Sequence, residues 1–504
     1  MSAKAKSGDD WGAIDAHQIA PLSALFAADP ERAERLSIDV AGLHFDWSKT
    51  HLDEGLVKAF GGLAETRQFA TAREALFSGA IVNPSEGRAA THVAERGQGA
   101  PADVARARAQ HERMRSLIDA IEGGAFGEVH SLLHIGIGGS ALGPELLLDA
   151  LGRNAGGYGV SVLSNVDGQA FDDAVDPLDP ETSLVVAVSK TFSTSETLLN
   201  LQSALRWLTE AGVEDPYGRV IAITASPQAA IDFGIDETRI LKFDEGIGGR
   251  YSLWSAVGFS AALALGWQAF EELLEGAAEM DRHFRLAEPE ANAPMLAAFA
   301  DLLYRQKLGC QSRAVFPYDE RLRLLVPYLQ QLEMESNGKL VGADGKAVGR
   351  PTAPVTWGGV GTDAQHAVFQ LLHQGSDLIP VEFVAVAEQD DGQDPAHHRA
   401  LLLNAFAQGA ALMAGEAGDD PYRPCPGDRP SATILINRLD PHSLGALIAF
   451  YEHRTFANAV LLGINPFDQF GVELGKRLAG ELGDPQAREN FDPSTRNLIE
   501  RAGL

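Results

Sequence analysis

Three short segments carry side chains that could move protons or stabilise negative charge. Glu333 and Glu335 stand two residues apart near the end of a helical stretch, Arg250 follows a pair of glycines, and His366 lies near a predicted helix start. Carboxylates and histidines act as general bases and acids, and arginine suits an oxyanion because it stays charged. Helical residues two apart point to nearly opposite faces, so we expect one of the two carboxylates to be a solvated surface charge.

Two further segments follow predicted strands and open predicted helices. Residues 134–144 have the sequence HIGIGGSALGP, and residues 189–197 have the sequence SKTFSTSET. Glycines let backbone N–H groups approach an anion, and a helix N-terminus adds partial positive charge. Both segments are therefore candidate phosphate sites. From the residues alone, an ordinary strand-to-helix turn and a plain helix cap remain the alternatives.

Gly136–Ala141 also matches the G-x-G-x-x-A pattern of dinucleotide-binding proteins. That pattern requires an acidic residue at the end of the next strand, about 20 residues further on. The next predicted strand ends near Asn165, and the first acid after it is Asp167, which comes late. A P-loop is not present at Gly471–Arg477, which lacks the required spacing and the Ser or Thr.

Length, composition and charge limit the classes of partner. The 504 residues are 45% hydrophobic and 22% charged, which is typical of a globular protein with two domains or more. The net charge of -28 argues against nucleic acid or an anionic membrane as the main partner. The first ten residues lack the apolar stretch of a signal peptide, and no run of 18 apolar residues is present. We expect a cytoplasmic protein with Cys310 and Cys425 reduced.

Strands and helices alternate from residue 129 onward, which predicts an α/β fold with parallel, doubly wound sheets. The first series has predicted strands at 129–137, 160–163, 184–188 and 220–224, and predicted helices at 142–151 and 195–211. The second series has predicted strands at 314–316, 381–387, 432–436 and 460–464, and predicted helices at 321–336 and 365–373. The part before residue 125 is mostly helical in pattern, with an amphipathic helix at 105–122.

Taken together, these segments resemble the signatures of the phosphoglucose isomerase (glucose-6-phosphate isomerase) family. The resemblance extends from about residue 40 to 480, and it includes Asp46–Lys49, Glu86–Arg88, Gly427–Ser431 and Phe467–Lys476. It implies two SIS-type αβα sandwich domains with parallel sheets, a homodimer with shared active sites, and neither a metal nor a cofactor. The implied organisation is a helical segment at 1–124, domains at 125–270 and 271–465, and a helical segment at 466–504.

The resemblance also implies a role for each matching residue. Glu335 would be the base, Arg250 would stabilise an enediolate, and His366 from the partner subunit would open the sugar ring with support from Lys476. The implied substrate contacts are Gly139, Ser140, Ser189, Lys190, Thr191, Thr194, Gln331 and Gln469. The chain departs from the family at Ala141, usually Asp, and at Ser193, usually Thr. We expect His373, seven residues after His366, to be structural.

The implied reaction is the reversible isomerisation of D-glucose 6-phosphate and D-fructose 6-phosphate, through ring opening and a cis-enediolate, in glycolysis and gluconeogenesis. Such a reaction needs a base near carbon-bound protons, an electrophile for the oxyanion, and exclusion of water. A non-catalytic sugar-phosphate sensor would need the phosphate segments but not the candidate catalytic residues. The presence of all four of them argues against a sensor, namely Glu335, Arg250, His366 and Lys476. An NAD-dependent dehydrogenase is disfavoured because Asp167 comes late. We therefore predict an aldose–ketose isomerase of a small sugar phosphate.

Overall fold

The computed structural model describes residues 11–153, 157–389, 392–416, 418 and 420–504. The first ten residues, on which the prediction about a signal peptide rests, lie outside this part. No helix among the described residues has the length and apolar character needed to cross a membrane. The chain divides into a large unit, Met1–Pro466, and a small one, Phe467–Leu504.

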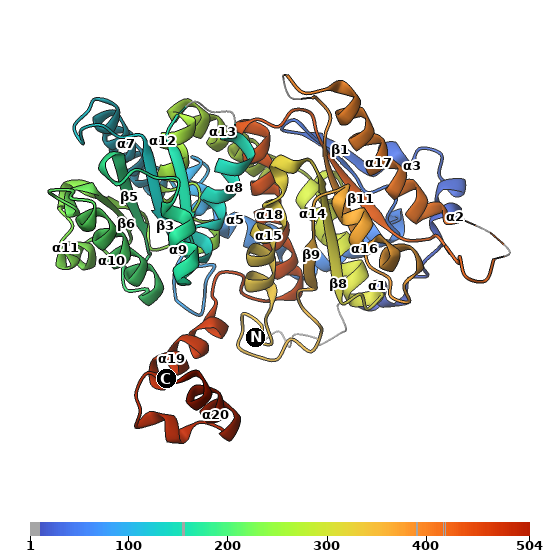
Figure 1. Ribbon diagram of the computed structural model, residues 1–504. Coiled ribbons are helices and arrows are strands. Elements are labelled where there is room, and N and C mark those ends of the chain that lie inside the picture. Colours follow the sequence, from blue (N-terminus) through green and yellow to red (C-terminus); the bar gives the residue numbers. More distant parts are fainter. Residues whose placement is uncertain (1–10, 154–156, 390–391, 417, 419) are drawn as a thin grey trace, which may run out of the picture. The chain divides into compact units, whose positions relative to one another are not determined.

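The first sheet of the large unit has five parallel strands in the order β4-β3-β5-β6-β7 (Figure 1). Its strands are β3 (Ser131–Ile135), β4 (Gly159–Leu163), β5 (Ser183–Val188), β6 (Val220–Thr224) and β7 (Ile240–Lys242), connected by helices that include α8 (Leu142–Leu151), α9 (Gly168–Val175), α10 (Ser195–Glu210) and α11 (Pro227–Phe233). β3, β5 and β6 are buried along their whole length, as expected for strands with helices on both faces. The strand order reverses between β3 and β5, and sheets of this kind bind ligands at the carboxyl ends of such strands.

The second sheet is mixed and has six strands in the order β1-β2-β11-β10-β8-β9. Four strands are parallel, namely β8 (Ser312–Tyr318), β9 (Val355–Gly358), β10 (Val381–Val386) and β11 (Ser431–Ile436). The hairpin of β1 (Ser37–Val40) and β2 (Leu43–Asp46) adds to β11 in antiparallel orientation. Its two turn residues, Ala41 and Gly42, both have positive φ, 52° and 76°, which is typical of a type I′ turn. The mostly helical N-terminal part therefore also supplies two strands.

Long helices pack between the two sheets (Figure 1). α18 (Pro441–Leu462) is buried along almost its whole length and packs against α13 (Trp267–Leu286) and α14 (Ala293–Leu302). The predicted strand at 460–464 is wrong, because α18 continues to Leu462 and ends at Gly463, whose φ is 71°. A helix that is buried on every side shows little alternation between apolar and polar faces, so a short apolar run within it resembles a buried strand.

The predicted helix at 321–336 is divided into three pieces. They are the 3₁₀ turn η9 (Glu320–Leu322), the helix α15 (Leu325–Leu329) and a π-helix, η10 (Gln330–Glu335). π-helices are rare and frequently lie at functional sites. Both the predicted base and Gln331 lie on this π-helix.

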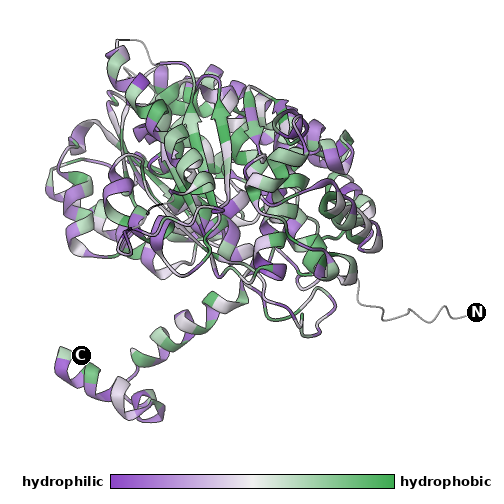
Figure 2. Cartoon of the chain, turned by 90° about the vertical axis from the view of Figure 1, so that its right-hand side faces the viewer, coloured by the Kyte–Doolittle hydropathy of each residue, from purple (hydrophilic) through white to green (hydrophobic). Residues whose placement is uncertain are grey.

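Further helices complete the molecule. In the large unit these are α1 (Gly12–Ala16), α2 (Leu22–Ala28), α3 (Arg32–Arg35), α4 (Glu54–Thr66), α5 (Phe69–Phe77), α6 (His92–Glu95), α7 (Pro101–Glu122), α12 (Phe259–Leu265), α16 (Asp363–Gln374) and α17 (Pro395–Ala414). The small unit contains α19 (Glu473–Leu482) and α20 (Pro493–Ala502). Hydrophobic residues concentrate in the strands and the central helices (Figure 2). The predicted domain boundaries at residues 124, 270 and 465 stay predictions.

Candidate active site

Residues 134–144, the first candidate anion-binding segment, include the end of β3 and form the short 3₁₀ turn η1 (Gly138–Ser140) before α8. The Nε2–H of His134 donates to the carbonyl oxygen of Ser140 at 2.8 Å, and Nδ1 lies 2.8 Å from the hydroxyl of Ser260. His134 is fully buried, and this burial lowers its pKa to about 4. The imidazole ring is therefore neutral at pH 7, and its hydrogen bond to Ser140 holds the turn in place from its buried side. Sequence reasoning missed this histidine, because it stands inside an apolar strand.

The second segment follows β5 and brings hydroxyls together in front of α10. The Oγ of Ser189 and the Oγ1 of Thr194 share a hydrogen bond at 3.1 Å. Ser193 donates to the hydroxyl of Thr191 at 2.7 Å, so the residue at this departure from the family forms a second hydroxyl pair in the segment. Phe192 has a φ of 50° and is buried, and it anchors the bend. Because β3 and β5 are neighbours, the two anion-binding segments follow adjacent strands.

Lys190 connects the second segment to the loop before Arg250. Its ammonium group donates to the carbonyl oxygens of Glu245 at 2.7 Å and Ile247 at 2.8 Å. Burial, and next the positive charge of Arg88, lower the pKa of Lys190 to about 8. The predicted contact of Lys190 with substrate stays a prediction, and its observed contacts hold two loops together.

Gly139 permits a close backbone approach between the first segment and the 3₁₀ turn η5 (Gly249–Tyr251). A Cβ atom on Gly139 would lie 2.1 Å from the carbonyl carbon of Gly249 and 2.5 Å from the backbone nitrogen of Arg250. No side chain fits at such distances. The glycine is therefore required here for packing, and it places the first segment directly on the backbone that carries Arg250.

Arg250 and Glu335 face each other across the site. The Nη1 atom of Arg250 lies 3.7 Å from Oε1 of Glu335, with the arginine side chain 2% exposed and the carboxylate 19% exposed. A Cβ atom on Gly138 would lie 2.8 Å from the side-chain nitrogen of Gln331. The π-helix η10 therefore presents Gln331 to the first anion-binding segment and Glu335 to the guanidinium. A carboxylate that is partly exposed beside a buried cation can act as a base on a bound molecule.

Glu333 has a different environment from the one expected. Its carboxylate lies 2.5 Å from the guanidinium of Arg313 and accepts a hydrogen bond of 2.7 Å from Thr356. The expectation of a solvated surface charge is therefore wrong, because the side chain is only 12% exposed and is paired with a buried cation. The two carboxylates do point to different partners, as their spacing predicts.

The structure does not bring every predicted residue to the pair formed by Arg250 and Glu335. His366 lies on α16 and is exposed, and within the described residues neither a hydrogen bond nor an ion pair joins it to Arg250 or Glu335. Gln469 and Lys476 belong to the small unit, so their relation to the site stays a prediction. His373 accepts or donates a hydrogen bond of 3.0 Å with Gln408 of α17, consistent with a structural role.

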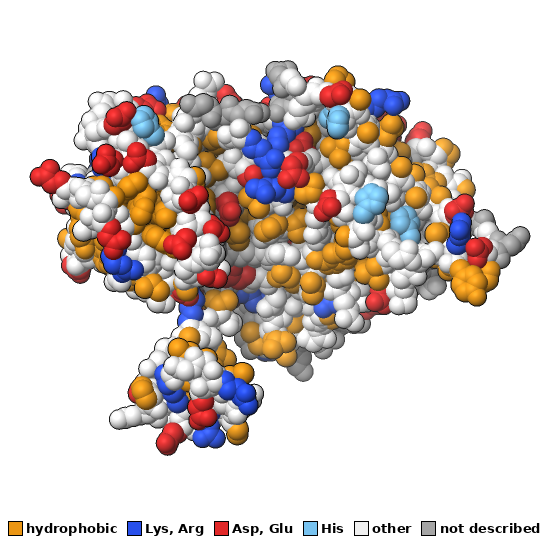
Figure 3. Space-filling model, viewed as in Figure 1, with side chains coloured by type: hydrophobic (Ala, Val, Ile, Leu, Met, Phe, Trp, Pro, Cys, Tyr) orange, Lys and Arg blue, Asp and Glu red, His pale blue; other side chains and the backbone are white. Residues whose placement is uncertain are grey.

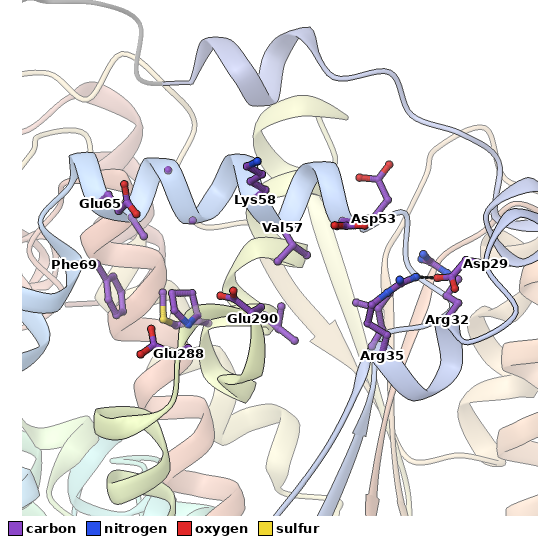
Figure 4. Close-up of a pocket in the computed structure, with 18 of the residues that line it drawn as sticks. Asp29, Arg32, Arg35, Asp53, Val57, Lys58, Glu65, Phe69, Glu288 and Glu290 are labelled. Atoms are coloured by element: carbon purple, nitrogen blue, oxygen red, sulfur yellow. Dashed lines mark ion pairs between the residues drawn. The ribbon is translucent and has the colours of Figure 1, made fainter.

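A separate cavity of about 1010 Å³ lies between α2, α4 and the segment that leads into α14 (Figure 4). None of the predicted site residues lines it, and its lining has six acidic and four basic side chains. Arg32 there donates to the carbonyl oxygens of Thr50 and Leu52 at 2.6 Å, and Arg35 pairs with Asp29. With an acidic excess and with these two cations engaged, this cavity does not suit a phosphate ester.

No group of three or more His, Cys, Asp or Glu side chains in the described part of the chain is arranged to hold a metal ion. From the described residues we expect anion binding by two loops, proton transfer by Glu335 and charge stabilisation by Arg250. The fold and the site are therefore those of an α/β enzyme that binds an anionic substrate and moves a proton.

Comparison with known proteins narrows this class. A family model for phosphoglucose isomerase matches residues 46–499. The glucose-6-phosphate isomerase of Rhizorhabdus wittichii is 64% identical to the chain, and the match covers 98% of each protein. The glucose-6-phosphate isomerase of Zymomonas mobilis is 59% identical, and the match covers 98% of the chain and 97% of the relative. A crystal structure of a glucose-6-phosphate isomerase from Chlamydia trachomatis matches with a TM-score of 0.90 at 31% identity, covering 99% of each chain.

The chain belongs to the phosphoglucose isomerase family. The predicted family, the α/β fold class and the enzyme class, an aldose–ketose isomerase, are confirmed. The roles of the single residues stay predictions.

Proposed function

We propose that the chain interconverts D-glucose 6-phosphate and D-fructose 6-phosphate in the cytoplasm, as a step of glycolysis and gluconeogenesis, with Glu335 as the base. The observation that carries this assignment is the carboxylate–guanidinium pair of Glu335 and Arg250, 3.7 Å apart, beside two anion-binding segments. Family membership supplies the substrate, and the pair supplies the groups that the proton transfer needs.

In the open-chain aldose, Glu335 takes the proton from C2. The electron pair of that C–H bond forms the C1–C2 double bond, and the carbonyl electrons move to O1. Arg250 stabilises the negative charge that develops on the oxygens of this enediolate. The proton of the C2 hydroxyl passes to O1, and O2 then carries the negative charge. As the C2 carbonyl forms from O2, the electrons of the C1–C2 double bond take the proton that Glu335 returns to C1, which gives the ketose. One carboxylate thus serves both carbons, and the reaction consumes no redox partner.

The phosphate of the substrate would bind to the hydroxyls of Ser140, Ser189, Thr191 and Thr194 and to the backbone of Gly139. These groups lie at the starts of α8 and α10, where N–H groups are available to an anion. Binding an anion through local donors suits a chain with a net charge of -28. Gln331 and Gln469 would contact the sugar.

The test uses purified enzyme and a coupled assay with fructose 6-phosphate. Glu335→Gln keeps the shape of the side chain but removes its basicity, so kcat should fall by at least roughly 10²–10⁴-fold, the usual contribution of an acid–base group. Deuterium uptake from heavy water into the substrate should be lost in parallel, while a sugar-acid phosphate inhibitor should still bind. Prolonged EDTA treatment of the wild type should leave its rate unchanged. A near-normal rate in Glu335→Gln would contradict the assignment.

The same proposal includes a homodimer in which His366 opens the ring in the active site of the partner subunit, with support from Lys476. In support, α16, which carries His366, lies beside α17 through hydrogen bonds of Gln365 with Asn404 and of His373 with Gln408. Both helices expose apolar side chains (Figure 3), among them Leu371, Leu403 and Phe406, which are 46%, 51% and 45% exposed. Such a face suits burial against a second copy.

Mixed dimers test the shared site. Subunits with Glu335→Gln and subunits with His366→Ala should each be inactive, and a random mixture should recover about one quarter of wild-type activity, since half the dimers then hold one intact site. The control mixes Glu335→Gln with Arg250→Ala subunits, whose two defects lie in one subunit's site and cannot complement. Absence of recovery in proven hybrids would contradict the proposal, as would equal recovery in the control.

A further inference from the structure

Two pairs of consecutive residues meet at the site, one on η5 and one at the end of η10. Arg250 faces Glu335, and the next residues, Tyr251 and Ser336, face each other behind them, with their hydroxyl oxygens 3.0 Å apart. Across the two pairs, Nε of Arg250 donates to the hydroxyl of Ser336 at 2.6 Å. Ser336 is 0% exposed and Tyr251 is 1% exposed, so this second pair is sealed from solvent.

The contacts of Arg250 fix the plane of its guanidinium group. Nε is held by Ser336, and Nη2 donates to the carbonyl oxygen of Pro466. A planar group held at two nitrogens cannot rotate about its own axis. Its Nη1 atom is left 3.7 Å from Glu335, which is longer than a hydrogen bond.

An arginine without these restraints would close on the carboxylate. Arginine and carboxylate groups form bidentate pairs with N–O distances of roughly 2.7–2.9 Å. Such a pair would occupy the lone pairs that the base needs and would turn the guanidinium away from the substrate. The hydroxyl of Ser336 opposes this closure, because it accepts a hydrogen bond from Nε of Arg250, whose N–H points away from Nη1.

We propose that Ser336, supported by Tyr251, is a positioning residue that holds Arg250 off Glu335, so that the carboxylate keeps its base function and the guanidinium faces the enediolate oxygens. This inference rests on the proposed function of Glu335 and Arg250. Tyr251 orients the serine hydroxyl through the 3.0 Å contact, and its ring is fixed against the buried ring of His92, with centroids 4.8 Å apart.

Ser336→Ala is the primary test. Release of Arg250 should lower kcat by about 10²-fold, the cost of a misplacement of about 1 Å in a catalytic group, while KM for fructose 6-phosphate changes far less because the phosphate contacts are elsewhere. A closer guanidinium also favours the ionised carboxylate, so the acid limb of the kcat profile should move to lower pH. Ser336→Thr retains a hydroxyl and should restore most of the rate and the wild-type acid limb.

Two further variants separate positioning from folding. Tyr251→Phe removes one hydroxyl only and should shift the acid limb in the same direction by a smaller amount, which keeps the test available if Ser336→Ala does not fold. Ser255→Ala removes another buried hydroxyl, which donates to the carbonyl oxygen of Ser252 at 2.7 Å and does not contact Arg250. Ser255→Ala should lose some stability but keep the wild-type acid limb.

The outcomes are distinct. The inference would be overturned if Ser336→Ala had the kcat and the acid limb of the wild type. It would also be overturned if both Ser336 variants lost stability while the acid limb of the kcat profile stayed at the wild-type pH. Glu335→Gln is measured alongside. If Glu335→Gln is inactive and Ser336→Ala is normal, only the positioning role fails. If Glu335→Gln turns over substrate normally, the proposed function of the base has failed.

Discussion

The carboxylate of Glu333 lies 2.5 Å from the guanidinium of Arg313, whereas Glu335, two residues later on the same π-helix, faces Arg250. Arg313 on β8 also pairs with Glu382 on β10 at 3.2 Å, and Arg454 on α18 pairs with Glu382 at 2.5 Å and with Asp301 on α14. This buried network ties η10 to two strands and two helices. The π-helix that carries the predicted base is therefore held by the ion pair of Glu333 with Arg313, on the side opposite Glu335.

Replacing Glu333 with Gln should destabilise the fold. Removing the carboxylate leaves the buried guanidinium of Arg313 without one of its counter-charges. The loss of one partner of a buried ion pair costs roughly 3–5 kcal/mol in the free energy of unfolding. Urea unfolding of the variant and the wild type measures this directly. Glu335→Gln serves as the control, because its carboxylate is more exposed and lies beyond hydrogen-bond distance of Nη1 of Arg250. A Glu333→Gln variant as stable as the wild type would mean that the network contributes nothing.

Catalytic efficiency should decline above pH 8 through loss of charge on Lys190. Its pKa is lowered to about 8, so in the free enzyme the ammonium loses its proton as the pH rises through this value and attracts the phosphate less. Lys190→Arg stays charged, so the alkaline limb of its kcat/KM profile should move to higher pH. Profiles of both enzymes from pH 6 to 10 give the comparison, and two coincident alkaline limbs would exclude Lys190 as the group responsible.

The contribution of Lys190 to stability has the opposite sign. Its folded pKa is about 8 and its ordinary value is 10.5, so between these values the unfolded chain binds more protons. Stability from this group therefore rises with pH in that window. A decline of activity above pH 8 with unchanged or increased unfolding free energy would identify the loss as one of binding.

Gly139→Ala should be far more damaging than Gly249→Ala, although the two glycines touch. A Cβ atom on Gly139 would lie 2.1 Å from backbone of Gly249, whereas a Cβ atom on Gly249 would lie 3.8 Å from Gly139, an ordinary contact. The first change must push η5 and Arg250 away, so it should lower both kcat and the unfolding temperature. Thermal unfolding and steady-state assays of the two variants test this, and equal effects would refute the packing explanation.

The double variant Thr191→Ala and Thr194→Ala should weaken binding of sugar phosphates specifically. The hydroxyl of Thr194 is hydrogen-bonded to that of Ser189, and the hydroxyl of Thr191 accepts a hydrogen bond from Ser193. Loss of both removes donors to the phosphate without touching Glu335. Inhibition constants for a phosphorylated and an unphosphorylated sugar acid should show a selective loss for the phosphorylated one. Equal weakening of both would remove the phosphate assignment from this segment.

Much of the architecture follows from local patterns. The strands β5 and β10 are runs of apolar residues with few interruptions, and the glycine- and hydroxyl-rich segments after β3 and β5 have the residues that an anion requires. Short or distant elements were not predicted. The three-residue strand β7 is too short for a periodic signal, and β2 finds its partner β11 almost four hundred residues further along the chain.

The sequence by itself determined which chemical groups are present, the alternation of strands and helices, and the family, because these depend on residue identity and on neighbours along the chain. Only the tertiary structure decided how those groups are used. Arg250 and Glu335 are 85 positions apart in the chain, and the packing of η5 against η10 brings them to 3.7 Å. The same packing separates Glu333 from Glu335, buries Ser336 against Tyr251 and leaves His134 neutral, since charge, burial and hydrogen-bond partners are set by contacts between segments that are remote in sequence.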